Sequence, residues 1–386
     1  MRLLSLACVL AALAAASVHA QPPRQVGSFL SESGGPVGVY PVATGLARPW
    51  AMAFLPDGRM LVTERTGQLR IVTPDGGVSA PVEGVPEVVA RGQGGLLDVA
   101  LDPDFETDPF VYLTYARPNP DGDGSATAVG RGRFVGDRIE GFEPLFTAEP
   151  YMRSRGHFGS RIVFGPEGHL FLTTGERFQF DPSQDLSNAL GAVVRIHRDG
   201  RIPSDNPFVG EEGVEAAIWS YGHRNIQAAA FDREGALYVA EMGPLGGDEL
   251  NRVEVGVNYG WPLVSWGMDY DGELIPNPTT RPDLTDAVSV WSPCIAPSGM
   301  AVYDGDVFPG WQGHMFIGSL VYRGIVHVVM EGGEVVDEHL YPIGQRIREV
   351  EQGPDGHLYV LTDRDDPDGQ VLVLRPIETR PPPEGG

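Results

Sequence analysis

Cysteine is scarce in this chain of 386 residues, which contains only Cys8 and Cys294. Residues 1–20 carry the pattern of a secretory signal peptide, since Arg2 precedes a largely apolar run and a small-x-small cleavage motif. Removal of this segment would leave Cys294 alone, so the exported chain could form no intramolecular disulfide. Its stability must then come from a packed core, from bound metal or from both.

Lysine is absent altogether. All 28 basic residues are arginine, against 52 acidic residues and a formal net charge of −24. So acidic a surface repels phosphate backbones, which argues against a nucleic-acid partner. Beyond residue 20, no apolar run approaches the roughly 20 residues that a membrane span requires. We therefore expect a soluble periplasmic or secreted protein. Apart from histidine, its cationic side chains are all planar guanidinium groups, which bind carboxylates through two parallel hydrogen bonds.

Sustained helical periodicity is also missing, and a β-type pattern takes its place. Four segments share an apolar lead-in, a turn ending in Gly, an alternating apolar run and an acidic residue: AFLPDGRMLVTE (53–64), VFGPEGHLFLTTGE (163–176), AFDREGALYVAE (230–241) and EQGPDGHLYVLTD (351–363). Asp-Gly or Glu-Gly between two such runs predicts a hairpin, because glycine adopts the positive φ of the turn. Four hairpins on one chain indicate a repeat architecture.

Two weaker copies, at 100–116 and 302–320, bring the number of repeats to six. Their turns lie near positions 56, 102, 166, 233, 303 and 354, roughly 46 to 70 residues apart. This spacing fits a four-stranded blade, and a closed ring of blades leaves few sheet edges exposed. We predict an all-β, six-bladed β-propeller over residues 39–376, with a loose N-terminal extension at 21–38 and a disordered tail at 377–386. A solenoid and a double sandwich are the alternatives.

Four places break the repeat and carry residues suited to chemistry. His157, in RSRGHFGSRIVF, has small neighbours and an ordinary pKa near neutrality, as a general base requires, although an isolated loop histidine can equally be incidental. Arg224 and Asn225, in SYGHRNIQAAAF, offer a fork of donors and an amide to an anionic or carbonyl-rich ligand. The alternative for Arg224 is a structural side chain that ties loops together.

The third place, EMGPLGGDELNRVEVGVNYGWP, is rich in oxygen donors. The carbonyls of Gly243, Pro244 and Tyr259 and the carboxylates of Asp248 and Glu249 are hard ligands, which suit calcium better than zinc. An acidic turn without metal is the alternative.

The fourth place is GQRIREV, where Arg346 and Arg348 alternate on a predicted strand and therefore face the same side. Two cations side by side repel each other. They need either an anionic ligand between them or an ion-pair network with Glu349 and other carboxylates.

The motifs GLARPWAMAF, GQGGLLDVALDPDF, GHFGSRIVF, GHRN, EMGPLGGDELN, NYGWP and RIREV occur in this order over nearly the whole chain. Together they resemble the soluble PQQ-dependent sugar dehydrogenases, in particular the aldose sugar dehydrogenase branch, whose fold is a six-bladed propeller. The resemblance implies that His157 takes the proton from the anomeric hydroxyl and that Arg224 stabilises charge on the reduced cofactor. It also implies cofactor contacts at Gln93, Arg224, Asn225, Tyr270, Ser319, Leu320, Val321, Arg346, Ile347 and Arg348, and calcium ligands at Gly243, Pro244, Glu249 and Tyr259.

One departure from the family pattern lies near GSL. Relatives often carry a lysine there, whereas this chain has Val321, so one cationic contact to the cofactor is missing. Arg323, two residues further on, is the nearest replacement.

The activity implied by the resemblance is oxidation of an aldose at C1 to a lactone, with hydride transfer to PQQ beside Ca²⁺. Electrons would pass to an acceptor such as a quinone, a cytochrome or a dye, and we expect a monomer. Two alternatives stay open. A calcium-dependent propeller hydrolase, such as a lactonase, would not need Arg346 and Arg348 at one site. A carbohydrate- or protein-binding propeller without cofactor is favoured by Val321.

Overall fold

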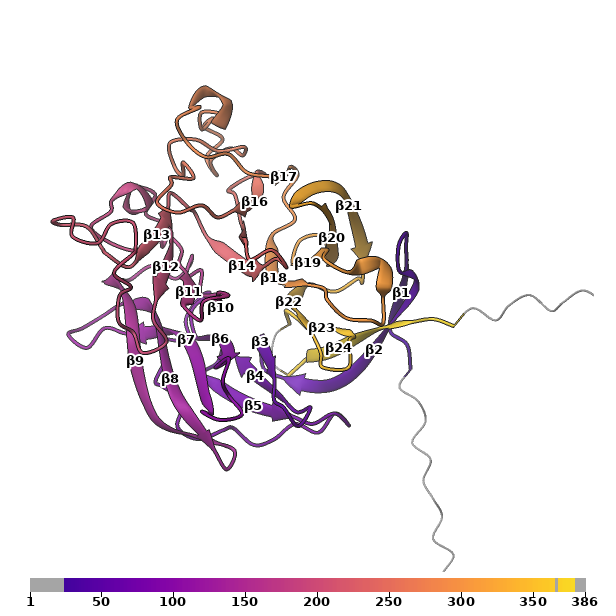
Figure 1. The fold of residues 1–386 in the computed structure, drawn as a ribbon. Coiled ribbons are helices and arrows are strands. Elements are labelled where there is room, and N and C mark those ends of the chain that lie inside the picture. The colour runs from indigo at the N-terminus through magenta and orange to yellow at the C-terminus, as the bar shows by residue number, and fades with distance from the viewer. Residues whose placement is uncertain (1–23, 365–366, 379–386) are drawn as a thin grey trace, which may run out of the picture.

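Six β-sheets surround a common axis in the computed structural model, which describes residues 24–364 and 367–378 (Figure 1). The first blade contains β3 (Pro49–Phe54), β4 (Met60–Glu64) and β5 (Gln68–Val72), and the second contains β6 (Leu96–Leu101), β7 (Phe110–Pro118), β8 (Ser125–Val135) and β9 (Arg138–Met152). The third contains β10 (Ile162–Phe164), β11 (Leu170–Thr173), β12 (Ala192–Ile196) and β13 (Ile218–Tyr221). The fourth contains β14 (Ile226–Phe231), β15 (Leu237–Glu241), β16 (Asp248–Arg252) and β17 (Ser289–Trp291). The predicted six-bladed propeller is confirmed.

The fifth and sixth blades complete the ring. The fifth contains β18 (Pro297–Val302), β19 (Met315–Ser319), β20 (Gly324–Glu331) and β21 (Glu334–Pro342). The sixth runs β22 (Ile347–Gln352), β23 (Leu358–Thr362), β24 (Gly369–Pro376), β2 (Gly35–Leu46) and β1 (Gly27–Ser31). The first strand of each blade lies nearest the axis in Figure 1. Among the described residues, no helix has both the length and the apolar composition to cross a bilayer.

The sixth blade joins the two ends of the chain. β2 pairs antiparallel with β24, for example Tyr40 with Val373, and β1 then pairs with β2. The prediction of a loose extension at 21–38 is therefore wrong for residues 27–38, where β1 and the start of β2 are joined by a turn. Their pairing covers the edge that β24 would otherwise expose. The predicted signal peptide and residues 379–386 of the predicted tail lie outside the described residues.

The predicted hairpin turns occur between the first and second strands of their blades. Gly58, Gly168, Gly235 and Gly356 adopt φ values of +84°, +77°, +85° and +77°. Their amides donate to carbonyls three residues earlier, as Gly58 does to Leu55 at 2.9 Å. A residue with a β-carbon would be strained at these φ values, so the repeated glycine follows from turn geometry.

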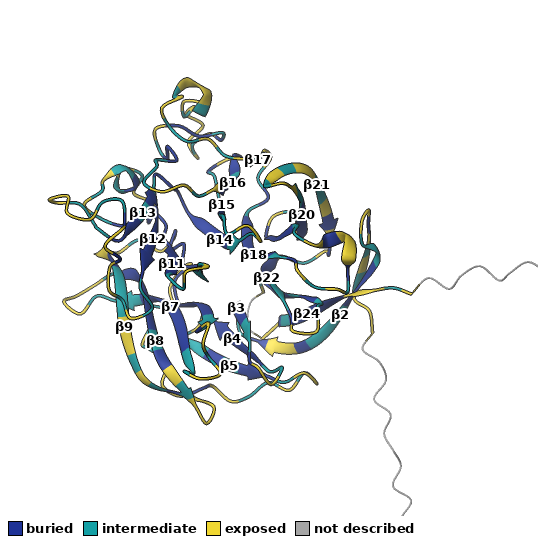
Figure 2. Ribbon diagram, viewed as in Figure 1, coloured by how far each residue is buried: buried dark blue, intermediate teal, exposed yellow. Residues whose placement is uncertain are grey.

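The core lies between neighbouring blades, where buried positions follow the strands and exposed ones gather on loops and on β9 (Figure 2). One cluster between the fifth and sixth blades contains Phe316, Val350 and Leu372, all nearly inaccessible to solvent. Because each blade packs on two neighbours, the ring is a rigid frame for the loops at its two ends.

Candidate active site

Each of the four clear repeats ends in a carboxylate, and all four carboxylates bind the segment that enters the first strand of their own blade or the loop beside it. These acids are Glu64, Glu176, Glu241 and Asp363. In the first blade the acid accepts the N–H of Ala47 at 2.6 Å, and in the fourth it accepts the N–H of Arg224 at 2.6 Å. In the third and sixth blades the partners are the side chains of His157 and Arg346. The repeated acid thus gathers predicted site residues at one end of the propeller.

A cavity of about 410 Å³ lies at this end of the axis. It is formed by residues that lie just before or within first strands, or that follow second strands, in several blades. Of the predicted cofactor contacts, its wall includes Gln93, Asn225, Leu320, Val321, Arg346 and Arg348. The sequence therefore identified residues that the fold brings to one place although they lie more than 250 positions apart.

The cationic part of the cavity is built around one carboxylate. Asp363 lies 2.7 Å from Nη2 of Arg346 and 3.3 Å from Nη2 of Arg348. Burial alone would raise the pKa of the Asp363 carboxyl, but the guanidinium groups of Arg348 and Arg346 lower it to about 2. Glu349, the predicted neutralising partner, instead contacts Arg161. Asp363 was missed in the sequence, although it is the terminal acid of a repeat.

Two buried arginine nitrogens lack the hydrogen bonds that they could donate. Nε of Arg348 and Nε of Arg224 have no hydrogen-bond partner within the described part of the chain. Burial lowers the pKa of Arg348, while Asp363 opposes that effect. A buried donor without an acceptor costs free energy, so both atoms suit an anionic or carbonyl-bearing ligand. Arg65, which the sequence reasoning did not select, also lines the cavity.

His157 lies at the edge of the cavity, since its neighbours Phe158 and Gly159 line the wall. It is 3% exposed, and its Nδ1 lies 2.9 Å from both carboxylate oxygens of Glu176. The carboxylate favours the tautomer with its proton on Nδ1, which leaves Nε2 as the basic nitrogen. Burial lowers the pKa of His157, and Glu176 partly opposes this. Glu176 is the second terminal acid that the sequence reasoning missed.

Arg224 is held in a cage of carbonyls and rings. Its Nη1 donates to the carbonyls of Met242 and Gly243 at 3.0 and 2.8 Å, and its Nη2 donates to the Tyr270 hydroxyl at 3.1 Å. The guanidinium carbon lies 5.2, 5.5 and 6.0 Å from the ring centroids of Trp261, Tyr270 and Phe178. Tyr270, a predicted cofactor contact, therefore contacts Arg224 and is not among the described residues that line the large cavity.

Three of the four predicted calcium ligands lie around one small cavity. Gly243, Glu249 and Tyr259 line one small cavity together with Glu241. Pro244 is not among the described residues that line it. Burial, then the nearby Glu241 carboxylate, raise the pKa of Glu249 well above its ordinary value.

The donors around this small cavity fit a hard cation. The Asn251 amide donates to Glu241 at 3.0 Å and to Glu249 at 3.2 Å. The neighbouring carboxylates of Glu241 and Glu249, beside Gly243 and Tyr259, are hard oxygen donors that Ca²⁺ would stabilise.

Two other predicted contacts point away from the large cavity. The Ser319 hydroxyl donates to the carbonyl of Ile295 at 2.6 Å, and Ile347 is fully buried in the core. Their neighbours Leu320 and Arg346 do line the cavity, and Arg346 donates to the Leu320 carbonyl at 3.1 Å.

The fold and the site together define a propeller enzyme whose axis holds a cationic cavity beside a histidine–carboxylate pair. The family model described as Glucose / Sorbosone dehydrogenase matches residues 46–373. An aldose sugar dehydrogenase of Escherichia coli (strain K12) is 44% identical over 339 residues, which cover 86% of this chain and 91% of the relative. Quinoprotein glucose dehydrogenase B of Acinetobacter calcoaceticus is 28% identical over 407 residues, covering 83% and 84%.

Solved structures agree with these matches. The apo-form crystal structure of the soluble E. coli aldose sugar dehydrogenase has a TM-score of 0.84 at 43% identity, covering 88% of this chain and 100% of that one. The PQQ-bound aldose sugar dehydrogenase of Streptomyces coelicolor has a TM-score of 0.73 at 29% identity, covering 88% and 98%. The chain belongs to the glucose/sorbosone dehydrogenase family of oxidoreductases, and the resemblance seen in the motifs is confirmed.

Proposed function

We propose that this protein is a PQQ- and calcium-dependent dehydrogenase that oxidises aldose sugars at C1 to lactones. The observation that carries the proposal is the large cavity. Arg346 and Arg348 share a single carboxylate there, and the His157–Glu176 pair stands at its edge. The PQQ-bound relative supports the choice of cofactor. A hydrolase would have no use for the Nε of Arg348, which is buried at this cavity without a hydrogen-bond partner among the described residues.

The cavity's side chains suit a flat polycarboxylate. Arg346 and Arg348 would pair with carboxylates of PQQ, since planar guanidinium groups bind them as forks. Gln93 and Asn225 add polar groups to the lining of the same cavity. When bound, PQQ supplies a quinone that accepts two electrons as hydride, and Ca²⁺ at the Glu249 and Tyr259 cavity supplies positive charge.

The chain's own residues handle the proton. His157 would receive the proton of the anomeric hydroxyl at Nε2, while Glu176 holds Nδ1 and stabilises the imidazolium that forms. Arg224, fixed by carbonyls and rings, would face the negative charge that builds up as the sugar is oxidised. The low exposure of His157 keeps bulk water from competing for its lone pair.

The proposal extends to the substrate, the electron acceptor, the location and the oligomeric state of the protein. The substrate is an aldose, and the electrons leave through an acceptor that is a quinone, a cytochrome or a dye. Export to the periplasm or medium rests on residues 1–20, and a monomeric state stays a prediction.

The test uses the chain without residues 1–20, stripped of metal and mixed with aldoses and a redox dye. We expect dye reduction only when both PQQ and Ca²⁺ are added. His157→Ala should lower turnover by about 100-fold or more while PQQ still binds, because a general base contributes about that much. Lactone hydrolysis without PQQ would instead support the calcium-dependent hydrolase, and wild-type turnover in His157→Ala would remove this residue from its role.

A further inference from the structure

Phe178 is an exposed aromatic side chain placed directly on the candidate base. Its ring centroid lies 3.5 Å from that of His157, with a tilt of 31° between the planes. Nevertheless 43% of Phe178 is exposed, whereas His157 beneath it is almost inaccessible. One face of the ring thus covers the imidazole and the other part remains open to solvent. Nothing in the proton-transfer scheme above uses this residue.

The chain fixes Phe178 firmly in this position. Its N–H donates to the same Glu176 carboxylate that holds His157, and its φ of 57° is in the left-handed region. Arg177, which is fully buried, donates to the carbonyls of Gly156 and Ser154 at 2.9 and 2.6 Å. These bonds join the Phe178 turn to the loop that carries the base. A left-handed backbone held by a buried carboxylate beside a candidate base is typical of functional loops.

Gly156 shows how closely the ring approaches that loop. A β-carbon at position 156 would lie 2.2 Å from a ring carbon of Phe178, well inside contact distance. With the Phe178 ring in this position, only glycine fits before the histidine, so the ring packs directly on the loop that carries the base.

Phe178 also lies close to Arg224. Its ring is 6.0 Å from the Arg224 guanidinium, and the ring of Tyr270 is 5.5 Å from the same group. Tyr270 is 56% exposed. Two exposed rings therefore lie beside Arg224, and one of them, Phe178, also packs on the ring of His157. Pyranose rings present C–H faces that lose water favourably against an aromatic surface.

We propose that Phe178 is a substrate-positioning residue that stacks on a C–H face of the aldose and so favours sugars with an uninterrupted C–H face. The proposal rests on the proposed function. An axial hydroxyl on that face would be pressed against the ring without a hydrogen-bond partner, which disfavours the sugar. Specificity would thus arise beside the base, from a residue fixed to the base by Glu176 and Arg177.

The experiment compares Phe178→Ala, Phe178→Leu and Phe178→Tyr with the wild type, each reconstituted with PQQ and Ca²⁺. D-Glucose and D-galactose, which differ in an axial hydroxyl, are the probes. For Phe178→Ala we expect the KM for glucose to rise about tenfold, with a smaller change in kcat and a reduced preference over galactose. Phe178→Leu should recover part of the affinity, and Phe178→Tyr most of it. PQQ affinity, measured by titration of the apoprotein, should stay unchanged.

Two further readouts separate positioning from a structural role. Removing the ring admits water to the imidazole, so the acid limb of the kcat/KM profile should move to higher pH in Phe178→Ala. Val336→Ala, a remote site with 50% exposure on β21, is the matched control and should change nothing.

The outcomes are distinct. An unchanged KM and sugar preference in Phe178→Ala would overturn this inference, and so would a joint loss of PQQ affinity and kcat. A wild type that fails to reduce dye with PQQ and Ca²⁺ would instead overturn the proposed function.

Discussion

The two ends of the axial channel differ in charge although the same strand contributes to both. At one end, Arg346 and Arg348 line the cavity of about 410 Å³. At the other, Glu349 and Glu351 line a chamber of about 470 Å³. The pairing of β22 with β23 shifts in register between Ile347 and Glu349. Such a bulge resets the alternation of side chains, so both arginines and both glutamates can face the axis.

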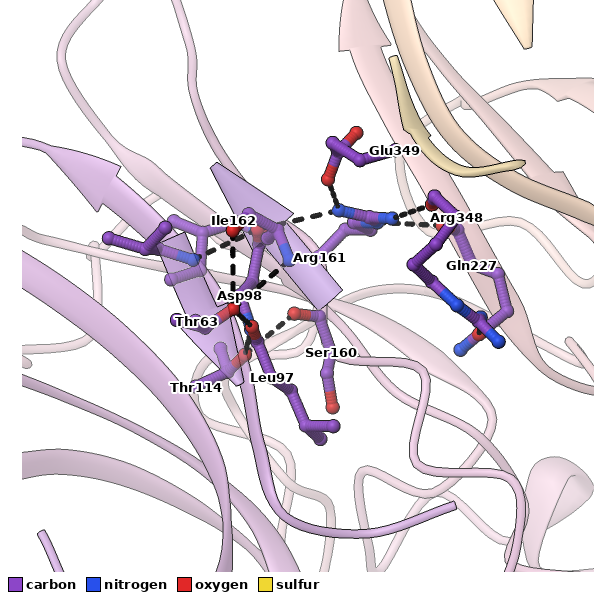
Figure 3. A network of polar contacts seen from close by, with 12 residues as sticks. Thr63, Leu97, Asp98, Thr114, Ser160, Arg161, Ile162, Gln227, Arg348 and Glu349 are labelled. Atoms are coloured by element: carbon purple, nitrogen blue, oxygen red, sulfur yellow. Dashed lines mark hydrogen bonds and ion pairs between the residues drawn. The ribbon is translucent and has the colours of Figure 1, made fainter. Parts of the chain in front are cut away.

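Arg161 lies between the two regions and connects them (Figure 3). Its Nη1 contacts Glu349 and lies 3.5 Å from Asp98, while its Nη2 donates to the Arg348 carbonyl at 3.2 Å. Burial raises the pKa of Glu349 to about 7 despite Arg161. The difference between the two ends shows that local placement of charge, rather than the net charge of −24, decides where an anion can bind.

The strongest way to break this arrangement is to remove the side chain that joins the two ends. Arg161→Met would leave Asp98 and Glu349 buried without their cation, so we expect a loss of about 3–5 kcal/mol in the free energy of unfolding. Arg201→Met, which removes an arginine that is 77% exposed and paired with Asp199, is the control and should have little effect. Denaturant unfolding of both variants measures this, and equal stabilities would contradict the role given to Arg161.

The next prediction concerns the cationic end. Arg348→Ala should weaken PQQ binding about 100-fold, because a buried charge-assisted hydrogen bond is lost. Arg348→Lys should retain part of the affinity, since a point charge replaces a fork. Titration of the apoprotein with PQQ gives both constants, with Arg375→Ala on β24 as a remote control. Equal affinity in Arg348→Ala would show that the cofactor binds elsewhere.

The architecture could be predicted from the sequence because its signals are local. The Gly of each hairpin turn, with positive φ at positions 58, 168, 235 and 356, is needed within a few residues of the strands that it joins. The closure of the ring could not be predicted in the same way. Pairing of β2 with β24 joins residues more than 300 positions apart, and nothing in the composition of residues 27–38 names that partner.

The site residues show the same difference between local signals, which the sequence contains, and contacts between distant segments, which it does not. His157, Arg224, Arg346 and Arg348 were found because unusual residues interrupt a repeat. Glu176 and Asp363 stand at the ends of quoted repeats, but their roles could not be predicted. The partner of a terminal acid depends on how the strands are placed in space. Arg161 lies inside the quoted motif GHFGSRIVF, yet its partner Glu349 is 188 positions away in the sequence. Phe178 lacked any signal, since an isolated phenylalanine usually marks a core.

A smaller effect is expected at the cationic end when Glu176, the partner of His157, is changed, and it is read from the pH dependence of kcat/KM. Because burial lowers the pKa of His157, the base stays neutral below its ordinary pKa of 6.5, and the acid limb of kcat/KM should lie below that pH. Glu176→Gln removes the group that raises this pKa, so the limb should move further down and turnover should fall about tenfold. A pH series on both enzymes measures the limbs, and a limb that moves upward in Glu176→Gln would contradict the pairing.

The smallest effect is expected in the acidic chamber. Burial, then Glu349 and Asp98, raise the pKa of Glu351 to about 8 from an ordinary value of 4.5, while Arg161 opposes them. The folded state therefore keeps a proton that the unfolded chain releases, and the stability this gives is complete below pH 4.5 and is lost as the pH rises through 8. Glu351→Gln removes that dependence.

Melting curves at two pH values test this directly. The melting temperature of Glu351→Gln should exceed that of the wild type by a few degrees at pH 9 and by little at pH 5. Glu234→Gln, on the exposed turn of the fourth blade, should follow the wild type at both. If Glu351→Gln gave the same shift at pH 5 and pH 9, the chamber would not hold a proton, and its carboxylates would be balanced by Arg161 alone. The two ends would then differ only in which groups their charged side chains contact, because the carboxyl groups of the chamber would be ionised as well.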